Sequence, residues 1–169
     1  MIKGTLALFE GMATTIKHIF KPPVTYQWPE EKKPFARRYK GRHELKRYDN
    51  GLEKCIGCAL CAAACPADAI WVEAAENTDE ERYSPGERYA KTYEINMLRC
   101  IFCGYCEDAC PTEAIVLEDH YELSFYDRAS AIYTKEMLIV PPSPGAQDTP
   151  QKVKPGAFNR AIPEMADSY

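Results

Sequence analysis

The sequence CIGCALCAAACP at residues 55–66 recurs as CIFCGYCEDACP at residues 100–111, with every matched position displaced by 45 residues. An Ala-Ile pair follows each copy and begins a β-like run, at residues 69–73 and 114–118. Strand-like segments at residues 44–48 and 92–96 precede the two copies. The chain therefore predicts two equivalent halves, each a strand, a cysteine loop, a short helix and a strand, paired about a pseudo-twofold axis.

Both copies have the spacing C-x2-C-x2-C-x3-C-P, which is typical of domains that hold two 4Fe-4S clusters. In this arrangement the first three thiolates bind one cluster and the fourth reaches across to the other. We predict two sets of metal ligands, Cys55, Cys58, Cys61 and Cys110 for the first cluster and Cys100, Cys103, Cys106 and Cys65 for the second. Because the fourth ligands are exchanged, cluster binding and folding are expected to be one event.

Zinc is the competing metal, since two C-x2-C knuckles suffice to bind it. Here each copy has a third cysteine at the same x2 spacing and a fourth cysteine followed by proline. Two clusters therefore account for all eight cysteines. Disulfide pairing is less favoured, because no signal-peptide pattern precedes the cysteines and we expect a reducing compartment. The spacing favours iron-sulfur clusters over both alternatives.

No catalytic constellation competes with this interpretation, because no cysteine is left over as a nucleophile. The three histidines, His18, His43 and His120, are scattered, and we interpret them as surface or packing residues rather than ligands. Glycine-rich phosphate loops and flavin or nicotinamide fingerprints are absent from the sequence. We therefore expect one-electron transfer and no substrate-turnover site in this chain.

Smaller residues of the cysteine loops are also interpretable. Gly57 and Gly104 are treated as counterparts that allow unusual torsions and bring backbone amides close to the sulfurs. Ile56 and Ile101 are expected to shield the clusters from water. Proline follows the crossing cysteine in both copies and should fix the turn there.

The flanks occupy about as much sequence as the repeat. Residues 1–20 have apolar side chains at spacings of three and four, which predicts an amphipathic helix, and its few charges are mostly positive. Such a helix suits a membrane interface or a groove between subunits, or it caps the chain's own small core. We divide the chain into a docking helix at 1–21, an extended basic connector at 22–43, the two-cluster domain at 44–120, an extension with a short helix at 121–140 and an irregular proline-rich arm at 141–169.

The net charge of −4 is modest, but eight lysines and arginines crowd residues 32–47. This basic run is expected to meet another protein or a membrane headgroup layer; nucleic acid is disfavoured, because the chain is acidic overall and has no nucleic-acid-binding motif. The sequence has no apolar run of about 18 residues, so we predict no membrane span. The polar stretch at 77–88 is predicted to be an exposed loop between the halves. The proline-rich arm is expected to follow the surface of something larger, or to be a disordered tail.

Three stretches, RYKGRHEL at 38–45, NGLEKCIGC at 50–58 and YEINMLRCIFCG at 93–104, resemble the two-cluster ferredoxin subunit of respiratory complex I, the NADH:quinone oxidoreductase subunit called chain I in bacteria. The resemblance covers roughly residues 1–140. It implies an α+β, bacterial two-cluster ferredoxin-like fold with a pseudo-twofold repeat, an N-terminal amphipathic helix and an extended C-terminal arm.

The same resemblance implies an electron-transfer subunit of a proton-pumping oxidoreductase, passing electrons towards a terminal cluster and quinone. Its expected partners are a neighbouring Fe-S subunit, a membrane subunit and the membrane surface, contacted through residues 1–21. The absence of a presequence rich in Arg and Ser indicates a bacterial version, expected at the cytoplasmic face of the inner membrane. The alternatives are a ferredoxin-like subunit of a membrane-bound hydrogenase, or a free two-cluster ferredoxin.

Overall fold

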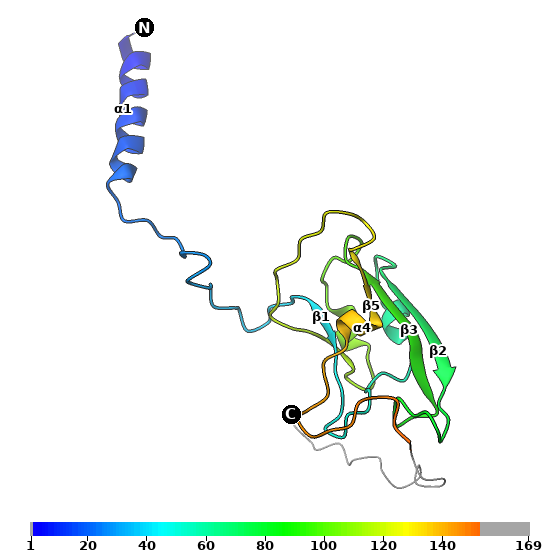
Figure 1. Cartoon of the computed structure of the whole chain (residues 1–169). Helices are drawn as coiled ribbons and strands as arrows, with labels where there is room; N and C mark the ends of the chain where they lie inside the picture. The colour runs from blue at the N-terminus through cyan, green and yellow to red at the C-terminus, as the bar shows by residue number, and fades with distance from the viewer. Residues whose placement is uncertain (1, 153–169) are drawn as a thin grey trace. The chain divides into compact units, whose positions relative to one another are not determined.

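The computed structural model of the chain describes residues 2–152, in two compact units that meet after Ala36. The first unit contains α1 (Ile2–Ile19) and an irregular segment up to Ala36. The second unit contains all the other elements: β1 (His43–Leu45), α2 (Leu60–Ala63), β2 (Ile70–Glu76), β3 (Arg88–Asn96), α3 (Tyr105–Asp108), β4 (Ile115–Leu117), β5 (Ile132–Thr134) and α4 (Lys135–Leu138) (Figure 1).

The α1 helix has a continuous apolar face that stays exposed. Its large apolar side chains recur at spacings of three and four, and those at Leu6, Phe9 and Ile16 are at least half exposed. Pro22 and Pro23 follow the helix and cannot continue it. Within residues 2–152, no helix is both long and apolar enough to cross a bilayer.

The second unit is built from crossed strand pairs. β1, which precedes the first cysteine loop, pairs antiparallel with β4, which follows the second loop. β2, which follows the first loop, pairs antiparallel with β3, which precedes the second. β5 adds to the free side of β3, giving sheets of order β1-β4 and β2-β3-β5. Each half thus supplies one strand to each sheet, and the unit is an α+β ferredoxin-like fold.

The core lies between these sheets and the two cysteine loops. Leu45 and Ile115 face each other across β1 and β4, and Ile70 and Ile95 face each other across β2 and β3. All four are buried in one apolar cluster that also includes Tyr93. The period-two alternation of β1 and β4 therefore directs both members of the pairs His43–Leu117 and Leu45–Ile115 into the interior, and Glu44 and Val116 lie on the other face.

The connection between β2 and β3 differs from the exposed loop predicted at 77–88. Arg82 is buried and Ser84 is fully buried, and β3 already begins at Arg88. Asn77 holds the turn, because its amide nitrogen donates to Ser84 Oγ at 2.9 Å and to the Gly86 carbonyl at 2.8 Å. The prediction of exposure is confirmed for residues 78–81, 87 and 88 but was wrong for Arg82 and Ser84, because polar residues can be buried when local hydrogen bonds and a covering segment satisfy them.

That covering segment is the start of the proline-rich arm. Gln151 exchanges two backbone hydrogen bonds with Arg82, at 2.9 and 2.8 Å. Further along the same segment, Asp148 forms an ion pair with Arg47 at 2.9 Å and Thr149 Oγ1 contacts the Arg47 guanidinium at 3.1 Å. Residues 148–151 therefore contact the chain's own domain, and the expectation that the arm follows the surface of something larger stays a prediction. The rest of the predicted arm, 153–169, lies outside the described residues.

The basic run at 32–47 is also partly neutralised inside the second unit. Lys40 pairs with Glu107 at 3.2 Å, Arg42 pairs with Glu44 at 3.4 Å, and Lys46 pairs with both Glu44 and Glu118. These lysines and arginines fasten β1 to the loops around it. The expectation that this run meets another protein or a headgroup layer stays a prediction, and in its second half Lys40, Arg42 and Lys46 also form ion pairs within the chain.

One buried ion pair ties α4 to the segment before the first cysteine loop. Lys135 Nζ lies 2.7 Å from Glu53 Oε2, both side chains are nearly inaccessible, and Lys135 also donates to the Ala90 carbonyl at 2.7 Å.

Lys135→Met should lower the free energy of unfolding by about 3–5 kcal/mol, because Glu53 would keep a buried charge without its partner. The measurement is the denaturation midpoint of the anaerobic, cluster-loaded protein.

The matched control is Lys91→Met, since Lys91 is an exposed lysine on β3. Its substitution should change stability by no more than about 0.5 kcal/mol. Equal losses in the two variants would show that the pair with Glu53 is not what stabilises the domain.

Candidate iron-sulfur sites

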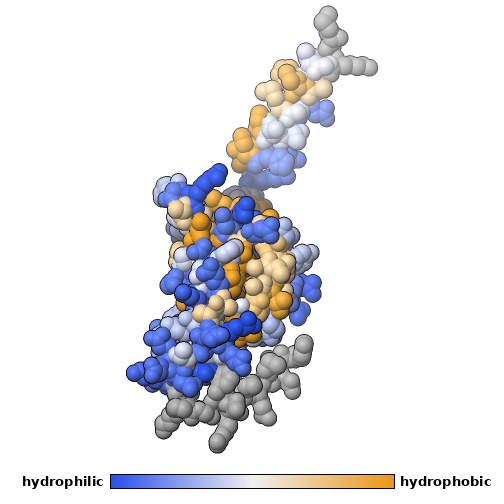
Figure 2. Space-filling model, turned by 90° about the vertical axis from the view of Figure 1, so that its right-hand side faces the viewer, coloured by the Kyte–Doolittle hydropathy of each residue, from blue (hydrophilic) through white to orange (hydrophobic). Residues whose placement is uncertain are grey.

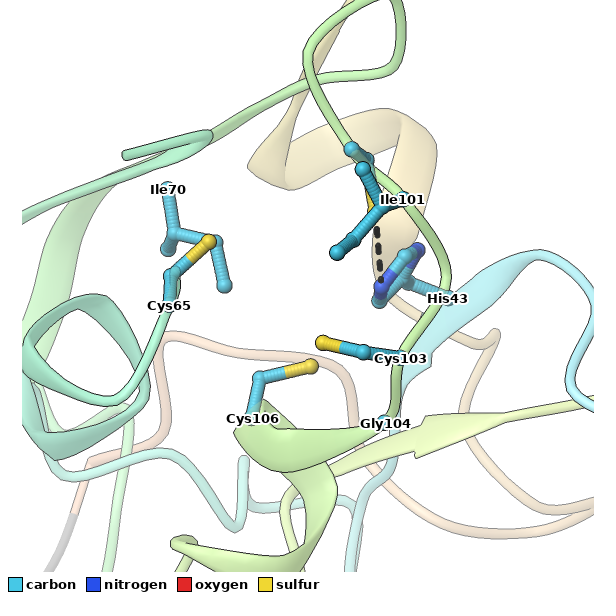
Figure 3. Close-up of a pocket in the computed structure, with 8 residues that line it drawn as sticks. His43, Cys65, Ile70, Ile101, Cys103, Gly104 and Cys106 are labelled. Atoms are coloured by element: carbon cyan, nitrogen blue, oxygen red, sulfur yellow. Dashed lines mark hydrogen bonds between the residues drawn. The ribbon is translucent and has the colours of Figure 1, made fainter. Parts of the chain in front are cut away.

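The eight cysteines surround two pockets, four in each. One pocket is lined by Cys65, Cys100, Cys103 and Cys106 (Figure 3). The other is lined by Cys55, Cys58, Cys61 and Cys110. All eight thiols are free. Each pocket thus combines three cysteines of one loop with the fourth cysteine of the other, which is the grouping that the predicted ligand sets require.

The short helices position the third cysteine of each set. Cys61 lies in α2 and Cys106 lies in α3, and both are buried. These helices pack against each other, so the two pockets lie on neighbouring parts of one core. After each helix the chain turns away from its own pocket. That turn delivers Cys65 to the second pocket and Cys110 to the first.

The loops need left-handed backbone at two positions each, and the glycines are not counterparts. Gly57 has φ of 65° and its counterpart 45 residues on is Phe102, with φ of 53°. Gly104 has φ of 85° and its counterpart is Ala59, with φ of 59°. Each loop therefore relieves one of its two strained positions with glycine and holds a side chain at the other. The assumption that Gly57 and Gly104 occupy the same place was wrong.

Backbone amides point at the sulfurs. Ala69 N–H donates to Cys65 Sγ at 3.4 Å, and at the equivalent place Ala114 N–H donates to Cys110 Sγ at 3.2 Å. Phe102 N–H donates to Cys100 Sγ at 3.4 Å. Amide donors of this kind stabilise negative charge on sulfur, which is what a thiolate that ligates a metal carries.

Burial opposes thiolates in the absence of a cation. It raises the pKa of Cys55 and of Cys106 to about 12 in each case. Burial also acts on Cys110, but hydrogen bonds from the backbone amides of Ile115 and Ala114 outweigh it and lower the pKa of that thiol. Burial also raises the pKa of Cys61 and of Cys100, so two thiols in each pocket are disfavoured as anions. Four converging thiols of this kind need the positive charge of bound iron to be deprotonated together.

The apolar walls complete the pockets. Ile56 lines the first pocket and Ile101 lines the second, although Ile101 is also 64% exposed.

Among residues 2–152, no group of three or more His, Cys, Asp or Glu side chains is arranged to hold a single metal ion. The thiols instead face each other across a pocket.

His43 is a site residue that the sequence did not identify. It was interpreted as a surface or packing residue, but it is fully buried, it lines the second pocket, and its Nε2 lies 3.8 Å from Cys100 Sγ (Figure 3). Burial lowers the pKa of His43 to about 4. In the first pocket, Tyr93 Oη lies 3.3 Å from Cys61 Sγ. His18 and His120 line neither pocket.

Comparison with known proteins agrees with this geometry. Residues 54–114 match a family model described as a 4Fe-4S dicluster domain. The chain is also similar to a chain in the structure of the membrane-bound sulfane sulfur reductase, an archaeal respiratory membrane complex, with 32% sequence identity and a TM-score of 0.45. That alignment covers 69% of this chain and 55% of the other chain, so this chain spans about half the length of that relative.

The residues present therefore fit two 4Fe-4S clusters. Two sets of four free thiols, each with backbone donors aimed at its sulfurs, lie within a matched dicluster domain. This excludes zinc and disulfides as the main reading of the repeat and makes the chain an iron-sulfur electron-transfer protein. The assignment of individual cysteines to the two clusters stays a prediction, supported by the way the pockets group them.

Exchange of the fourth ligands can be tested with a pair of variants. Cys65→Ser should lose or convert the cluster held by Cys100, Cys103 and Cys106 and leave the other intact, because Cys65 lines only that pocket. Cys110→Ser should have the opposite effect. The measurement is the paramagnetic spectrum of each dithionite-reduced variant, together with its iron and sulfide content. Loss of the first-loop cluster in Cys65→Ser would contradict the crossed assignment.

Proposed function

We propose that this chain is a one-electron relay in the peripheral arm of a proton-pumping NADH:quinone oxidoreductase, passing electrons towards the terminal cluster and quinone. Each bound 4Fe-4S cluster supplies a site that takes up and releases one electron. The observation that carries the proposal is the pair of four-thiol pockets built on one shared core. The eight cysteines of the two pockets would hold the clusters, and Ile56 and Ile101 add an apolar side chain to the first and second pocket, respectively.

The stretches that carry the resemblance to the complex I subunit have defined places in this structure. In the first, Gly41 N–H and Arg42 N–H donate to the Glu118 and His120 carbonyls at 2.9 and 2.6 Å, which fastens the connector to the second half. The same stretch supplies His43 to the second pocket and Leu45 to the core. These contacts support reading RYKGRHEL as a functional part of the domain rather than as a linker.

The proposal assigns α1 to the membrane side of the assembly. Figure 2 shows hydrophobic side chains exposed along this helix. The exposed apolar residues include Phe9, Met12 and Ile16, and the last turn carries Lys17 and His18. An amphipathic helix with cationic residues suits an anionic membrane surface or the flank of a membrane subunit. On this proposal the chain is peripheral and acts at the cytoplasmic face of a bacterial inner membrane.

Purification from the native membrane tests the assignment of the complex. The full chain, tagged after Tyr169, should co-purify in mild detergent with an NADH-oxidising flavoprotein subunit and quinone-reducing subunits. NADH should reduce the clusters in that preparation, and their paramagnetic signals should appear. Co-purification with hydrogenase subunits, or recovery of a monomer that exchanges electrons without partners, would replace complex I by one of the alternative carriers.

The role of α1 can be tested on one face of the helix at a time. Phe9→Glu should reduce rebinding of the cluster-loaded chain to membranes from cells that lack it by at least about tenfold, because it removes a large exposed apolar side chain from the proposed docking face and adds a charge. Thr14→Glu is the matched control: it adds the same charge away from the apolar face and removes only an exposed hydrogen bond to the Glu10 carbonyl. Binding is measured by co-sedimentation.

Both variants should retain both clusters, as judged by visible absorbance, because α1 lies in a different compact unit from the cysteines. Undiminished sedimentation of Phe9→Glu, or an equal loss in Thr14→Glu, would overturn the docking role.

A further inference from the structure

His43 and Tyr93 occupy equivalent positions in the two halves of the domain, although they are 50 residues apart in a repeat of 45. The strand registers establish this: His43 faces Leu117 across β1 and β4, and Tyr93 faces Val72 across β2 and β3. Val72 and Leu117 are themselves 45 residues apart, at the same place after each cysteine loop. The pseudo-twofold axis therefore relates His43 to Tyr93.

Both residues bring a polar group to a cysteine sulfur in the interior. Each is only 1% exposed. Tyr93 Oη lies 3.3 Å from Cys61 Sγ, at the first pocket, and His43 Nε2 lies 3.8 Å from Cys100 Sγ, at the second (Figure 3). Each pocket thus receives one buried polar side chain from the opposite half. Tyr93 lies on the strand before the second cysteine loop and reaches the first pocket, whereas His43 lies on the strand before the first loop and reaches the second pocket. The two contacts differ in chemistry, a phenol in one and an imidazole in the other.

The direction of both hydrogen bonds follows from the protonation states. A ligating thiolate has no proton, so its sulfur only accepts. The Tyr93 phenol has one O–H, which can donate to the sulfur 3.3 Å away. An imidazole has at least one ring N–H that it can donate. The Nδ1 of His43 has no hydrogen-bond partner among the described residues, so a proton on Nε2 is the arrangement that makes a contact.

We propose that His43 and Tyr93 are paired residues that set the reduction potentials of the two clusters separately: Tyr93 O–H donates to Cys61 on the first cluster and His43 Nε2–H donates to Cys100 on the second. A hydrogen bond to a ligand sulfur favours the reduced cluster, because the added negative charge spreads onto sulfur. Each donor contacts a sulfur of only one predicted ligand set, and the low dielectric of the interior strengthens that hydrogen bond, so each acts mainly on the near cluster. The inference rests on the predicted ligand sets and not on which membrane complex contains the chain.

The test uses substitutions that remove the donor and retain the ring. Tyr93→Phe removes one hydroxyl, and His43→Phe removes the imidazole nitrogens. Loss of one charge-assisted hydrogen bond should reduce the equilibrium constant for one-electron reduction by about tenfold, or about 59 mV. Potentiometric titration of the full-length holoprotein, followed by its paramagnetic signals, should show a lower midpoint for the first cluster in Tyr93→Phe and for the second cluster in His43→Phe.

Matched controls separate the donor from the packing. Ile95→Val and Leu138→Val each remove a buried methylene from the core without changing a donor, and neither residue lines a pocket. They should leave both midpoints in place. His43→Tyr, which gives the second pocket the kind of donor found at the first, should recover part of the shift. Equal shifts in the controls, or a shift of the wrong cluster, would overturn the proposal.

A second measurement needs no substitution in case His43→Phe fails to assemble its cluster. Holoprotein grown with ¹⁵N-labelled histidine should show a weak nitrogen coupling in pulsed paramagnetic spectra of the reduced second cluster and none on the first. His18 and His120 line neither pocket, so His43 is the expected source of any such coupling. Absence of the coupling from the second cluster would overturn the assignment of His43, whichever complex the chain proves to belong to.

Discussion

The exchange of the fourth cysteine is the constraint on which the rest of the structure depends. Cys65 and Cys110 line the pocket opposite to the loop that carries them, so neither pocket is complete within one half. The crossed pairing of β1 with β4 and of β2 with β3 follows the same logic, because each strand pair also joins one half to the other. A chain of this size cannot bury a large core, and metal ligation across the halves supplies the cohesion that apolar burial lacks.

Much of this arrangement is readable from the sequence because it is local. Three of the four cysteines of each pocket lie within seven residues of sequence, and the Ala-Ile pairs predict where the strands β2 and β4 begin. The position of His43 beside a cysteine could not be predicted from the sequence, because a local insertion shifts the alignment of the two halves. A turn at 48–52, closed by a hydrogen bond from Tyr48 N–H to the Leu52 carbonyl at 2.8 Å, adds five residues before the first loop that the second half lacks. Alignment by cysteines therefore matches Tyr93 to Tyr48, and only the strand register reveals His43 as its counterpart.

The buried polar groups of the periphery were unpredictable because their partners are remote in sequence. Arg47 donates to the Val140 carbonyl at 2.9 Å and pairs with Asp148, about a hundred residues away. Arg82 meets Gln151, and Glu53 meets Lys135. A charged residue seen alone in a sequence suggests an exposed surface or an external partner, and burial becomes possible only when folding brings its partner to it. This is why the basic run and the proline-rich arm suggested external contacts, whereas much of both is used internally.

Departures from the pseudo-twofold symmetry fall at positions that matter for electron transfer. If both halves presented the same donors to their sulfurs, the two clusters would have similar surroundings and similar potentials. At one pair of equivalent positions, the chain instead has a tyrosine in one half and a histidine in the other. At two other pairs, it has glycine in one half and phenylalanine or alanine in the other. Both kinds of difference act within hydrogen-bonding range of sulfur, where the amide of Phe102 already contacts Cys100. The repeat thus builds two clusters of one type, and the substitutions within it give each cluster its own surroundings.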